Sequence, residues 1–401
     1  MASKDDIVLA APVRTPIGKF GGVLASLSAA DLGTSAAAAA LSLAHLDPAR
    51  VDQVIFGHAR QAGGGPNTAR QIAFRAGVPV DRPAYTVNQA CGSGLQAVLS
   101  AARTILNGEA RVVLAGGTES MSNTPYLLPR ARWGYRLGNA EIVDGMYKDG
   151  FNDPLSGLVM GETAEELAAE AGIDRAAADA WALGSQQRCE RSQAAGRFAA
   201  EIVPVTVAGK KGDTVVTTDE HPRAGTTIES LGKLAPVFRE GGTVTAGNAS
   251  GITDGAAALV VASREAALEL GLAVVARLVG WQVVGVEPRI MGIGPVPAVQ
   301  KLLAKAGWTG QAIDDVELNE AFASQVLACL KGLPDLDPER VNRDGGAIAL
   351  GHPIGATGAR ILVTLLHGLA ARGGQRGIAT LCVSGGMGLA ALVEMEGRAA
   401  A

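Results

Sequence analysis

The two ends of this 401-residue chain are similar in sequence, and this similarity limits the possible folds more than any other feature. The segment ACGSGLQAVLSAARTILNGEARVVLAGGTES parallels LGHPIGATGARILVTLLHGLAARGGQRGIATLCVSGGMG, and RVDQVIFGHARQAG parallels AIDDVELNEAFASQ. In the first pair, a reactive residue, Cys91 or His352, lies beside glycine at the mouth of a predicted helix. Proteins of the α/β class repeat such elements in any case, but the agreement in order and spacing favours a true duplication.

Strand-like runs such as DIVLAAP and VDQVIFG alternate with Ala- and Leu-rich helical stretches, which predicts an α/β fold. The segment from about 122 to 252 is turn-rich and amphiphilic, and we interpret it as an insertion between the copies. We therefore expect an N-terminal half at 1–121 and 253–274, an inserted loop domain at 122–252, and a C-terminal half at 275–401. More than one domain is the usual organisation for a chain of this length.

The overall charge argues against a polyanionic partner. The net charge is −4 and there is no basic block, so we expect no nucleic acid, although a few arginines suffice for a small phosphorylated ligand. The N-terminus lacks the apolar core of a secretory signal, and we expect a cytoplasmic protein with no membrane segment. The four cysteines form no CxxC pair, which argues against a zinc site. A reducing compartment also makes disulfides between them improbable.

Cys91 lies in VNQACGSGLQAV, where a strand-like VN gives way to small residues and then to an apolar helical pattern. At a helix start the exposed N–H groups and the dipole should favour the thiolate and lower the thiol pKa. Gly92 and Gly94 would leave space for an acyl group close to the backbone. The competing interpretation is a buried structural cysteine, and CGSG alone is weakly specific.

His352, in GGAIALGHPIGATGARIL, mirrors Cys91 in the second copy, which favours a functional role over that of an ordinary core or surface histidine. An imidazole there can act as a base for a thiol. Cys382 closes a strand in IATLCVSGGMG, at the end of the strand where sites in α/β sheets usually lie. A thiol there can move a proton to or from carbon.

Three other residues have more ordinary interpretations. Cys189 and Cys329 lie in the middle of helices by pattern, and we interpret both as structural. Asn319, in VELNEAFASQ, follows a strand and precedes a helix. Its side chain could cap that helix or hold a catalytic water, and the pattern leaves both possibilities open.

Taken together, these segments resemble the thiolase family. The motifs are CGSG at Cys91, NEAF at Asn319, GGAIALGHPIGATGARI around His352 and LCVSGGMG around Cys382. The resemblance extends to APVRTPIGKFGG, LGKLAPVFREGGTVTAGNASGITDGAAA and MGIGPVPA, and as a set these motifs are highly specific. It implies duplicated βαβαβαββ halves with a layered αβαβα core. It also implies an acetyl-CoA C-acetyltransferase of lipid or fatty acid metabolism, with CoA as substrate and no covalent cofactor or metal.

The resemblance also implies roles for single residues. Cys91 would attack an acyl-CoA and carry the acyl group as a thioester. His352 would take the Cys91 proton and then, with a water held by Asn319, stabilise the enolate-like oxygen of the second acyl-CoA. Cys382 would remove the α-proton in condensation or supply it in cleavage. The acyl oxygen on Cys91 would lie between the backbone N–H groups of Cys91 and Ser384, where family members often have glycine at the second position.

For the substrate, the resemblance implies that Arg223, Ser230 and Ser250 contact CoA, and arginine suits phosphate recognition. A solvated turn charge is the alternative for Arg223. The acyl end would be lined by Val159, Met160, Phe238, Met291 and Phe322. Short-chain biosynthetic members usually have histidine where this chain has Val159, so longer or branched 3-oxoacyl chains stay open as substrates. A homodimer or homotetramer is implied, and we expect tetramer contacts or CoA phosphate near Arg130, Arg132 and Arg136.

Two other functions fit parts of this pattern. A condensing enzyme of the ketoacyl synthase or hydroxymethylglutaryl synthase kind shares the duplicated fold and a nucleophilic cysteine, but those relatives manage without a second thiol such as Cys382. A non-catalytic homologue that binds acyl-CoA or lipid is the third possibility. The complete set of reactive residues argues against it.

Overall fold

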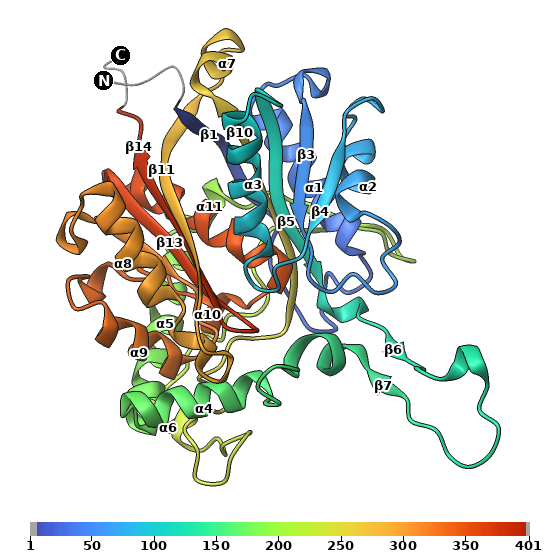
Figure 1. The fold of residues 1–401 in the computed structure, drawn as a ribbon, viewed down its shortest axis with the longest axis vertical. Helices are drawn as coiled ribbons and strands as arrows, with labels where there is room; N and C mark the ends of the chain where they lie inside the picture. Colours follow the sequence, from blue (N-terminus) through green and yellow to red (C-terminus); the bar gives the residue numbers. More distant parts are fainter. Residues whose placement is uncertain (1–5, 398–401) are drawn as a thin grey trace.

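The computed structural model describes residues 6–397, built around one ten-stranded mixed sheet (Figure 1). The strand order is β12-β13-β14-β11-β1-β10-β5-β3-β4, and the short β2 pairs with β10. The strands are β1 (Ile7–Arg14), β2 (Gly18–Lys19), β3 (Gln53–Gly57), β4 (Ala84–Val87), β5 (Val112–Ser120), β10 (Thr253–Ser263), β11 (Val274–Gly285), β12 (Asp315–Leu318), β13 (Arg376–Val383) and β14 (Met387–Met395).

The sheet consists of two copies of one arrangement. In the first copy β3 is parallel to β4 and β5, and β10 is antiparallel to both β5 and β1. In the second, β12 is parallel to β13, and β14 is antiparallel to both β13 and β11. The second copy has no full strand that corresponds to β4, but a single parallel bridge between Val341 and Val316 of β12 takes its place. The predicted duplicated α/β fold is confirmed, and antiparallel pairing of β1 with β11 joins the copies.

The two halves of this sheet alternate with helices in five layers. Helices α1 (Ala29–Leu43) and α2 (Thr68–Arg75) share a core with one face of the first copy, and α8 (Pro295–Ala306) and α9 (Ala323–Gly332) with one face of the second. Between the copies lie α3 (Ser93–Leu106) and α11 (Ile354–Arg372), whose core also includes residues of both. Strand β10 is buried on both faces, as its run of Ala, Leu and Val predicts.

The two central helices approach closely because of glycine. A Cβ on Gly94 would lie 2.8 Å from the Ala359 nitrogen, and one on Gly358 would lie 2.3 Å from the Leu95 nitrogen. By length and composition α11 is apolar enough to cross a membrane, but most of it is buried between the two copies, as expected of a core helix.

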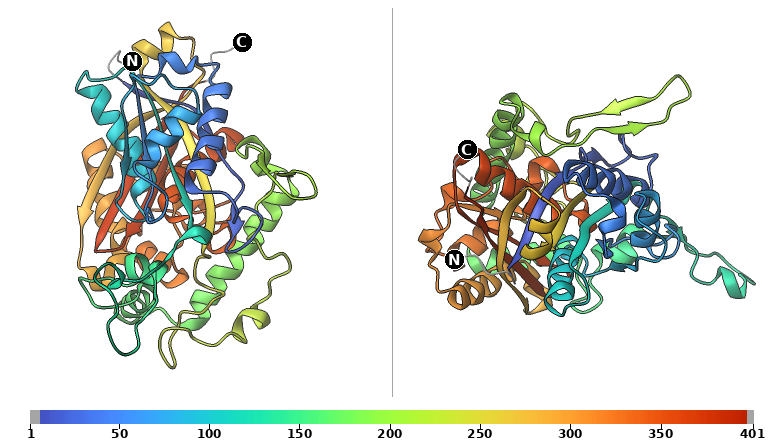
Figure 2. Two further views of the ribbon diagram at one scale, coloured as in Figure 1. Left: turned by 90° about the vertical axis from the view of Figure 1, so that its right-hand side faces the viewer. Right: turned by 90° about the horizontal axis from the view of Figure 1, so that it is seen from above.

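The chain leaves the sheet after β5 and returns at β10. In between, α4 (Met160–Ala171), α5 (Arg175–Ala194) and α6 (Ile228–Gly232) lie at the end of the molecule that also holds α9 and α10 (Ala347–Leu350) (Figure 1). Strands β6 (Tyr126–Leu127) and β7 (Val143–Asp144) form an arm that extends away from the body (Figure 1). Strands β8 (Val205–Val207) and β9 (Thr214–Val216) form a second projecting hairpin, and α7 (Arg264–Glu269) follows β10 (Figure 2).

Candidate active site

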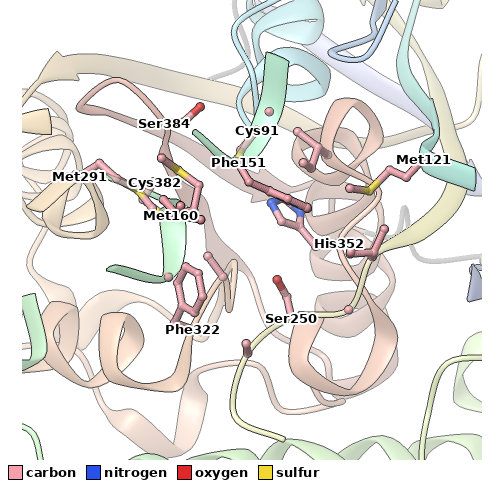
Figure 3. Close-up of a pocket in the computed structure, with 18 of the residues that line it drawn as sticks. Cys91, Met121, Phe151, Met160, Ser250, Met291, Phe322, His352, Cys382 and Ser384 are labelled. Carbon is pink, nitrogen blue, oxygen red and sulfur yellow. The ribbon is translucent and has the colours of Figure 1, made fainter. Parts of the chain in front are cut away.

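The three reactive residues singled out in the sequence line one cavity of about 200 Å³ (Figure 3). Cys91 directly precedes Gly92, the N-cap of α3, and His352 lies two residues before α11 begins. Cys382 is the penultimate residue of β13. The first copy of the fold therefore supplies Cys91, and the second supplies His352 and Cys382.

The backbone around Cys91 is constrained. Ala90 has a φ of 44°, in the left-handed region that alanine rarely adopts, and this conformation carries strain of the kind often found at functional sites. A Cβ on Gly92 would lie 3.1 Å from side-chain atoms of both Leu389 and Val383. The turn that presents the sulfur to the cavity is therefore fixed by packing against the second copy.

The expected low pKa of Cys91 is not found. Burial raises the pKa of this thiol, and this effect outweighs the opposing influence of the Arg60 charge and of the backbone N–H groups of Ser384 and Cys91. The sequence pattern placed the thiol correctly at a helix start but could not reveal how strongly the surroundings exclude water. The resting sulfur keeps its proton at neutral pH, so a nearby base is required.

His352 is oriented to be that base. Its Nδ1 lies 2.6 Å from Thr357 Oγ1, and the Thr357 hydroxyl donates to the Pro353 carbonyl at 3.0 Å. Because the hydroxyl proton is committed, Thr357 accepts from His352, so Nδ1 carries the proton and Nε2 a free lone pair. Nε2 is buried and has no partner among the described residues. Burial, followed by the charges of Arg360 and Arg60, lowers the pKa of His352 to about 3.

Cys382 lies on β13, and Asn319 follows the neighbouring strand β12. Cys382 is buried, and desolvation raises its pKa well above the usual thiol range. Asn319 directly follows β12, and its backbone N–H donates to the Thr380 carbonyl at 3.0 Å. Both polar atoms of its side-chain amide are buried without a partner among residues 6–397. The helix-capping alternative is not observed, because Phe322 is the N-cap of α9.

Ser384 opens the turn between β13 and β14. The two glycines that follow it both have a φ of 83°, and this geometry brings the Ser384 N–H within reach of the Cys91 sulfur. Two backbone N–H groups, those of Ser384 and Cys91, are thus placed where an acyl oxygen on the sulfur would lie.

All the predicted acyl-pocket residues line the cavity, namely Val159, Met160, Phe238, Met291 and Phe322. Figure 3 shows Met160 and Met291 on the Cys382 side, whereas Met121 and Phe151 lie near His352. The sequence analysis missed the lining residues Arg60, Met121, Tyr147, Phe151 and Ile354. Arg60 follows β3, so its position at the carboxyl end of a strand was the clue that could have identified it.

The predicted CoA contacts lie in the cavity and in a second pocket that adjoins it. Ser250 lines the cavity itself, and Arg223 and Ser230 line a second pocket that shares Ala249 and Gly251 with it. The Arg223 backbone N–H donates to Gln186 Oε1, while its side chain is exposed. A guanidinium that lines this second pocket is suitably placed for a phosphate.

The other two cysteines are buried within helices, and all four cysteines are free. Cys329 Sγ donates to the Gly292 carbonyl at 3.2 Å, and burial raises its pKa to about 12. Burial also raises the pKa of Cys189. These thiols belong to the packed interior, in agreement with the structural role expected for them. Within residues 6–397 no cluster of three or more His, Cys, Asp or Glu side chains is arranged to hold a metal.

The chain matches known proteins over nearly all of its described residues. Residues 7–265 match the thiolase N-terminal domain, and residues 272–395 match the thiolase C-terminal domain. Acetyl-CoA acetyltransferase from Cupriavidus necator is 50% identical over 98% of this chain and 100% of the relative. That from Escherichia coli is 51% identical over 96% of this chain and 98% of its own length.

Solved structures agree. Acetyl-CoA acetyltransferase from Bacillus anthracis superposes with a TM-score of 0.95 and 46% identity, covering 98% of this chain and 99% of that one. Human mitochondrial 3-ketoacyl-CoA thiolase in complex with CoA superposes with a TM-score of 0.94 and 43% identity, covering 99% and 100% of the two chains.

Proposed function

This chain belongs to the thiolase family, and on that premise we propose that it is an acetyl-CoA C-acetyltransferase with Cys91 as its nucleophile. The observation that carries the proposal is the meeting of Cys91, His352 and Cys382 in one cavity. A ketoacyl synthase type of enzyme would not need the second thiol, and a non-catalytic binder would need none of the three.

In the first half-reaction, Cys91 attacks the thioester carbonyl of acetyl-CoA, the acetyl group moves to the sulfur, and CoA leaves. The neutral His352 takes the Cys91 proton at Nε2 as the carbon–sulfur bond forms. The N–H groups of Cys91 and Ser384 stabilise the negative charge that develops on the acyl oxygen. Removing one such donor typically costs about a hundredfold or more in rate.

The second half-reaction moves a proton at carbon. Cys382 is a protonated thiol in the resting protein, because burial raises its pKa, and this suits it to protonate the acetyl-CoA enolate in cleavage. In condensation it first gives its proton to the CoA thiolate that leaves, and then takes the α-proton of the second acetyl-CoA. His352 and a water held by the unpartnered amide of Asn319 stabilise the enolate oxygen. Thioester exchange is nearly isoenergetic, so the reaction is reversible.

CoA binds across the two adjoining pockets that Arg223, Ser230 and Ser250 line, with Arg223 at its phosphate end. The enzyme acts in the cytoplasm, in lipid or fatty acid metabolism, as a homodimer or homotetramer. The tetramer contacts involve the β6–β7 arm, which carries Arg130, Arg132 and Arg136. Its exposed apolar side chains, including Trp133, Leu137 and Ile142, support an interface there. Deletion of residues 128–142 tests this, because it should lower the assembly size in light scattering.

A second substrate range has its own support. Val159 lines the cavity at the position where short-chain biosynthetic members usually have histidine, and it leaves an apolar wall beside Met160. Longer or branched 3-oxoacyl chains would contact this wall favourably. A thiolysis series of increasing 3-oxoacyl chain length decides between the two ranges, because activity confined to acetoacetyl-CoA would exclude the second.

The decisive test of the nucleophile is direct. The protein is mixed with acetyl-CoA, digested, and its peptides are weighed. An acetyl group is expected on the peptide that contains Cys91, and its absence would refute the proposed function.

A further inference from the structure

One charged residue of the cavity has no part in the reaction described above. Arg60 follows β3 and is only 8% exposed, and it lines the same cavity as Cys91 and His352. Its backbone N–H donates to Glu119 Oε1 at 3.1 Å, which holds this segment in place. Glu119 is itself fully buried and also accepts from the Gly355 N–H at 2.8 Å.

The Arg60 guanidinium is unpaired. Among residues 6–397, no side chain or carbonyl forms a hydrogen bond or ion pair with it, and its Nε is fully buried without a partner. Asp149 lines an adjoining hollow but is not ion-paired to it. The other deeply buried arginines differ, because Arg14 pairs with Glu201 and Asp219 and Arg360 pairs with Glu317. An arginine side chain stays charged, and a buried charge without a partner is costly.

A glycine leaves room for the Arg60 side chain. A Cβ on Gly150 would lie 2.4 Å from Arg60 Nη2, 2.5 Å from Nε and 2.6 Å from Cζ, so the guanidinium lies against the glycine backbone. Gly150 is not among the glycines with positive φ, so its missing side chain, and not its backbone conformation, leaves room for the guanidinium in this position. Elsewhere this part of the cavity is lined mainly by Met121, Phe151 and Ile354, which offer the cation no counter-charge.

We propose that Arg60 is a specificity-determining residue that selects 3-oxoacyl-CoA substrates whose acyl chain ends in a carboxylate. The inference rests on the proposed function, because it assumes that the acyl group is carried on Cys91. A terminal carboxylate would accept two charge-assisted hydrogen bonds from the guanidinium, a bidentate pair, inside a largely apolar pocket. Arg60 lines the same cavity as Cys91, and the preceding residue, Ala59, packs in one apolar cluster with Cys91, which places the two groups near each other.

The chemistry is that of ordinary thiolysis. Cys91 attacks the 3-oxo carbon, the bond between Cα and Cβ breaks, and the acetyl-CoA enolate takes a proton from Cys382. The ω-carboxyacyl group left on Cys91 is then transferred to the sulfur of free CoA. The products are acetyl-CoA and a dicarboxylic acid mono-CoA ester shortened by two carbons, and the carboxylate itself does not react.

The test compares substrates that differ only in the terminal group. These are 3-oxoadipyl-CoA against 3-oxohexanoyl-CoA, and 3-oxopimelyl-CoA against 3-oxoheptanoyl-CoA. In at least one pair, the wild-type protein should have the higher kcat/KM for the carboxylated member. Arg60→Leu should lower the ratio of kcat/KM for the carboxylated member to kcat/KM for the neutral member about 30-fold or more, since loss of one partner of a buried charge pair is costly. Arg60→Lys should retain part of the preference.

Arg75→Leu is the matched control, because Arg75 makes an exposed ion pair with Asp31 outside the cavity. It should change neither substrate pair. A wild-type preference for the neutral member at both lengths, or an equal effect of Arg60→Leu on both members, would overturn the inference. The wild-type comparison decides the matter even if Arg60→Leu does not fold. Normal turnover of acetoacetyl-CoA alongside such a result would leave the proposed function standing, whereas a protein that cannot be acetylated at Cys91 would refute that function itself.

Discussion

Thr357 Oγ1 accepts a hydrogen bond from His352 Nδ1 at 2.6 Å, and this contact fixes which imidazole nitrogen faces the cavity. Thr357 lies in the first turn of α11, and its own proton is committed to the Pro353 carbonyl. The helix that carries the histidine segment thus also sets its tautomer. Without this contact the ring could rotate and present the protonated nitrogen to Cys91.

Thr357→Val should therefore lower kcat for acetoacetyl-CoA thiolysis by about tenfold to a hundredfold, as expected for a misplaced catalytic group, with little change in KM. Steady-state kinetics at neutral pH measure this. Thr364→Val is the control, since Thr364 lies on the same helix but its hydroxyl bonds to Glu201. Equal kinetics for the two variants would show that the ring orientation does not depend on Thr357.

The two thiols should be separable by half-reaction. Cys382→Ala should still form the acetyl adduct on Cys91, because the CoA thiolate can leave without taking the Cys382 proton and no bond to the α-carbon changes in this half-reaction. It should lose about a hundredfold or more of condensation activity, since general acid–base catalysis is removed. Mass spectrometry of the Cys91 peptide and a condensation assay give the two readings. Full condensation activity in Cys382→Ala would favour a ketoacyl synthase type of mechanism.

Burial of His352 should make the folded protein less stable in mild acid. Its pKa is lowered to about 3, so below about pH 6.5 the unfolded chain binds a proton that the folded protein does not. Stability is then fully present above that pH and lost as the pH falls. At about pH 5.5 the loss from this residue is on the order of 1 kcal/mol.

Urea unfolding of the wild type and of His352→Asn at about pH 7.5 and about pH 5.5 tests this, since the variant should lose less stability on acidification. His221, whose pKa burial also lowers, should contribute in the same direction in both proteins. An identical pH dependence in the two proteins would contradict the expectation.

Glu119 should be essential for holding the two copies together at the site. It is fully buried, and its carboxylate accepts from the N–H groups of Ala59, Arg60 and Gly355 and lies 3.1 Å from His58 Nε2. Glu119→Gln turns one acceptor into a donor that faces other donors, and it should cost about 2 to 4 kcal/mol of unfolding free energy. Glu269→Gln is the control, because Glu269 pairs with Arg50 and Arg111 on the exposed surface, so this substitution should change the unfolding free energy little.

The sequence predicted the duplicated fold and the reactive residues because both are encoded locally. Cys91, His352 and Cys382 each lie in a short motif at the junction of a strand or helix with a glycine-rich turn. Because the two copies repeat the same arrangement, these junctions meet at the same end of the fold. The predicted acyl-pocket residues also reach the cavity. That part rested on family resemblance, because Met160 and Phe322 would otherwise be indistinguishable from core residues.

What the sequence could not predict depends on contacts between distant segments. The pKa of Cys91 is raised by surroundings that come from both copies and the insertion, and a helix-start argument cannot measure that burial. The tautomer of His352 depends on the direction of one hydroxyl. The lack of a partner for the Arg60 charge depends on which residues of other segments surround its guanidinium.

The matching strand order of the two copies has an evolutionary consequence. Before the halves were fused, two identical units facing each other would have carried the same residue at both helix mouths. Fusion into one gene freed each copy to change independently. One became the carrier of the nucleophile and the other the supplier of proton chemistry, a division of labour that a symmetric pair of identical units could not encode.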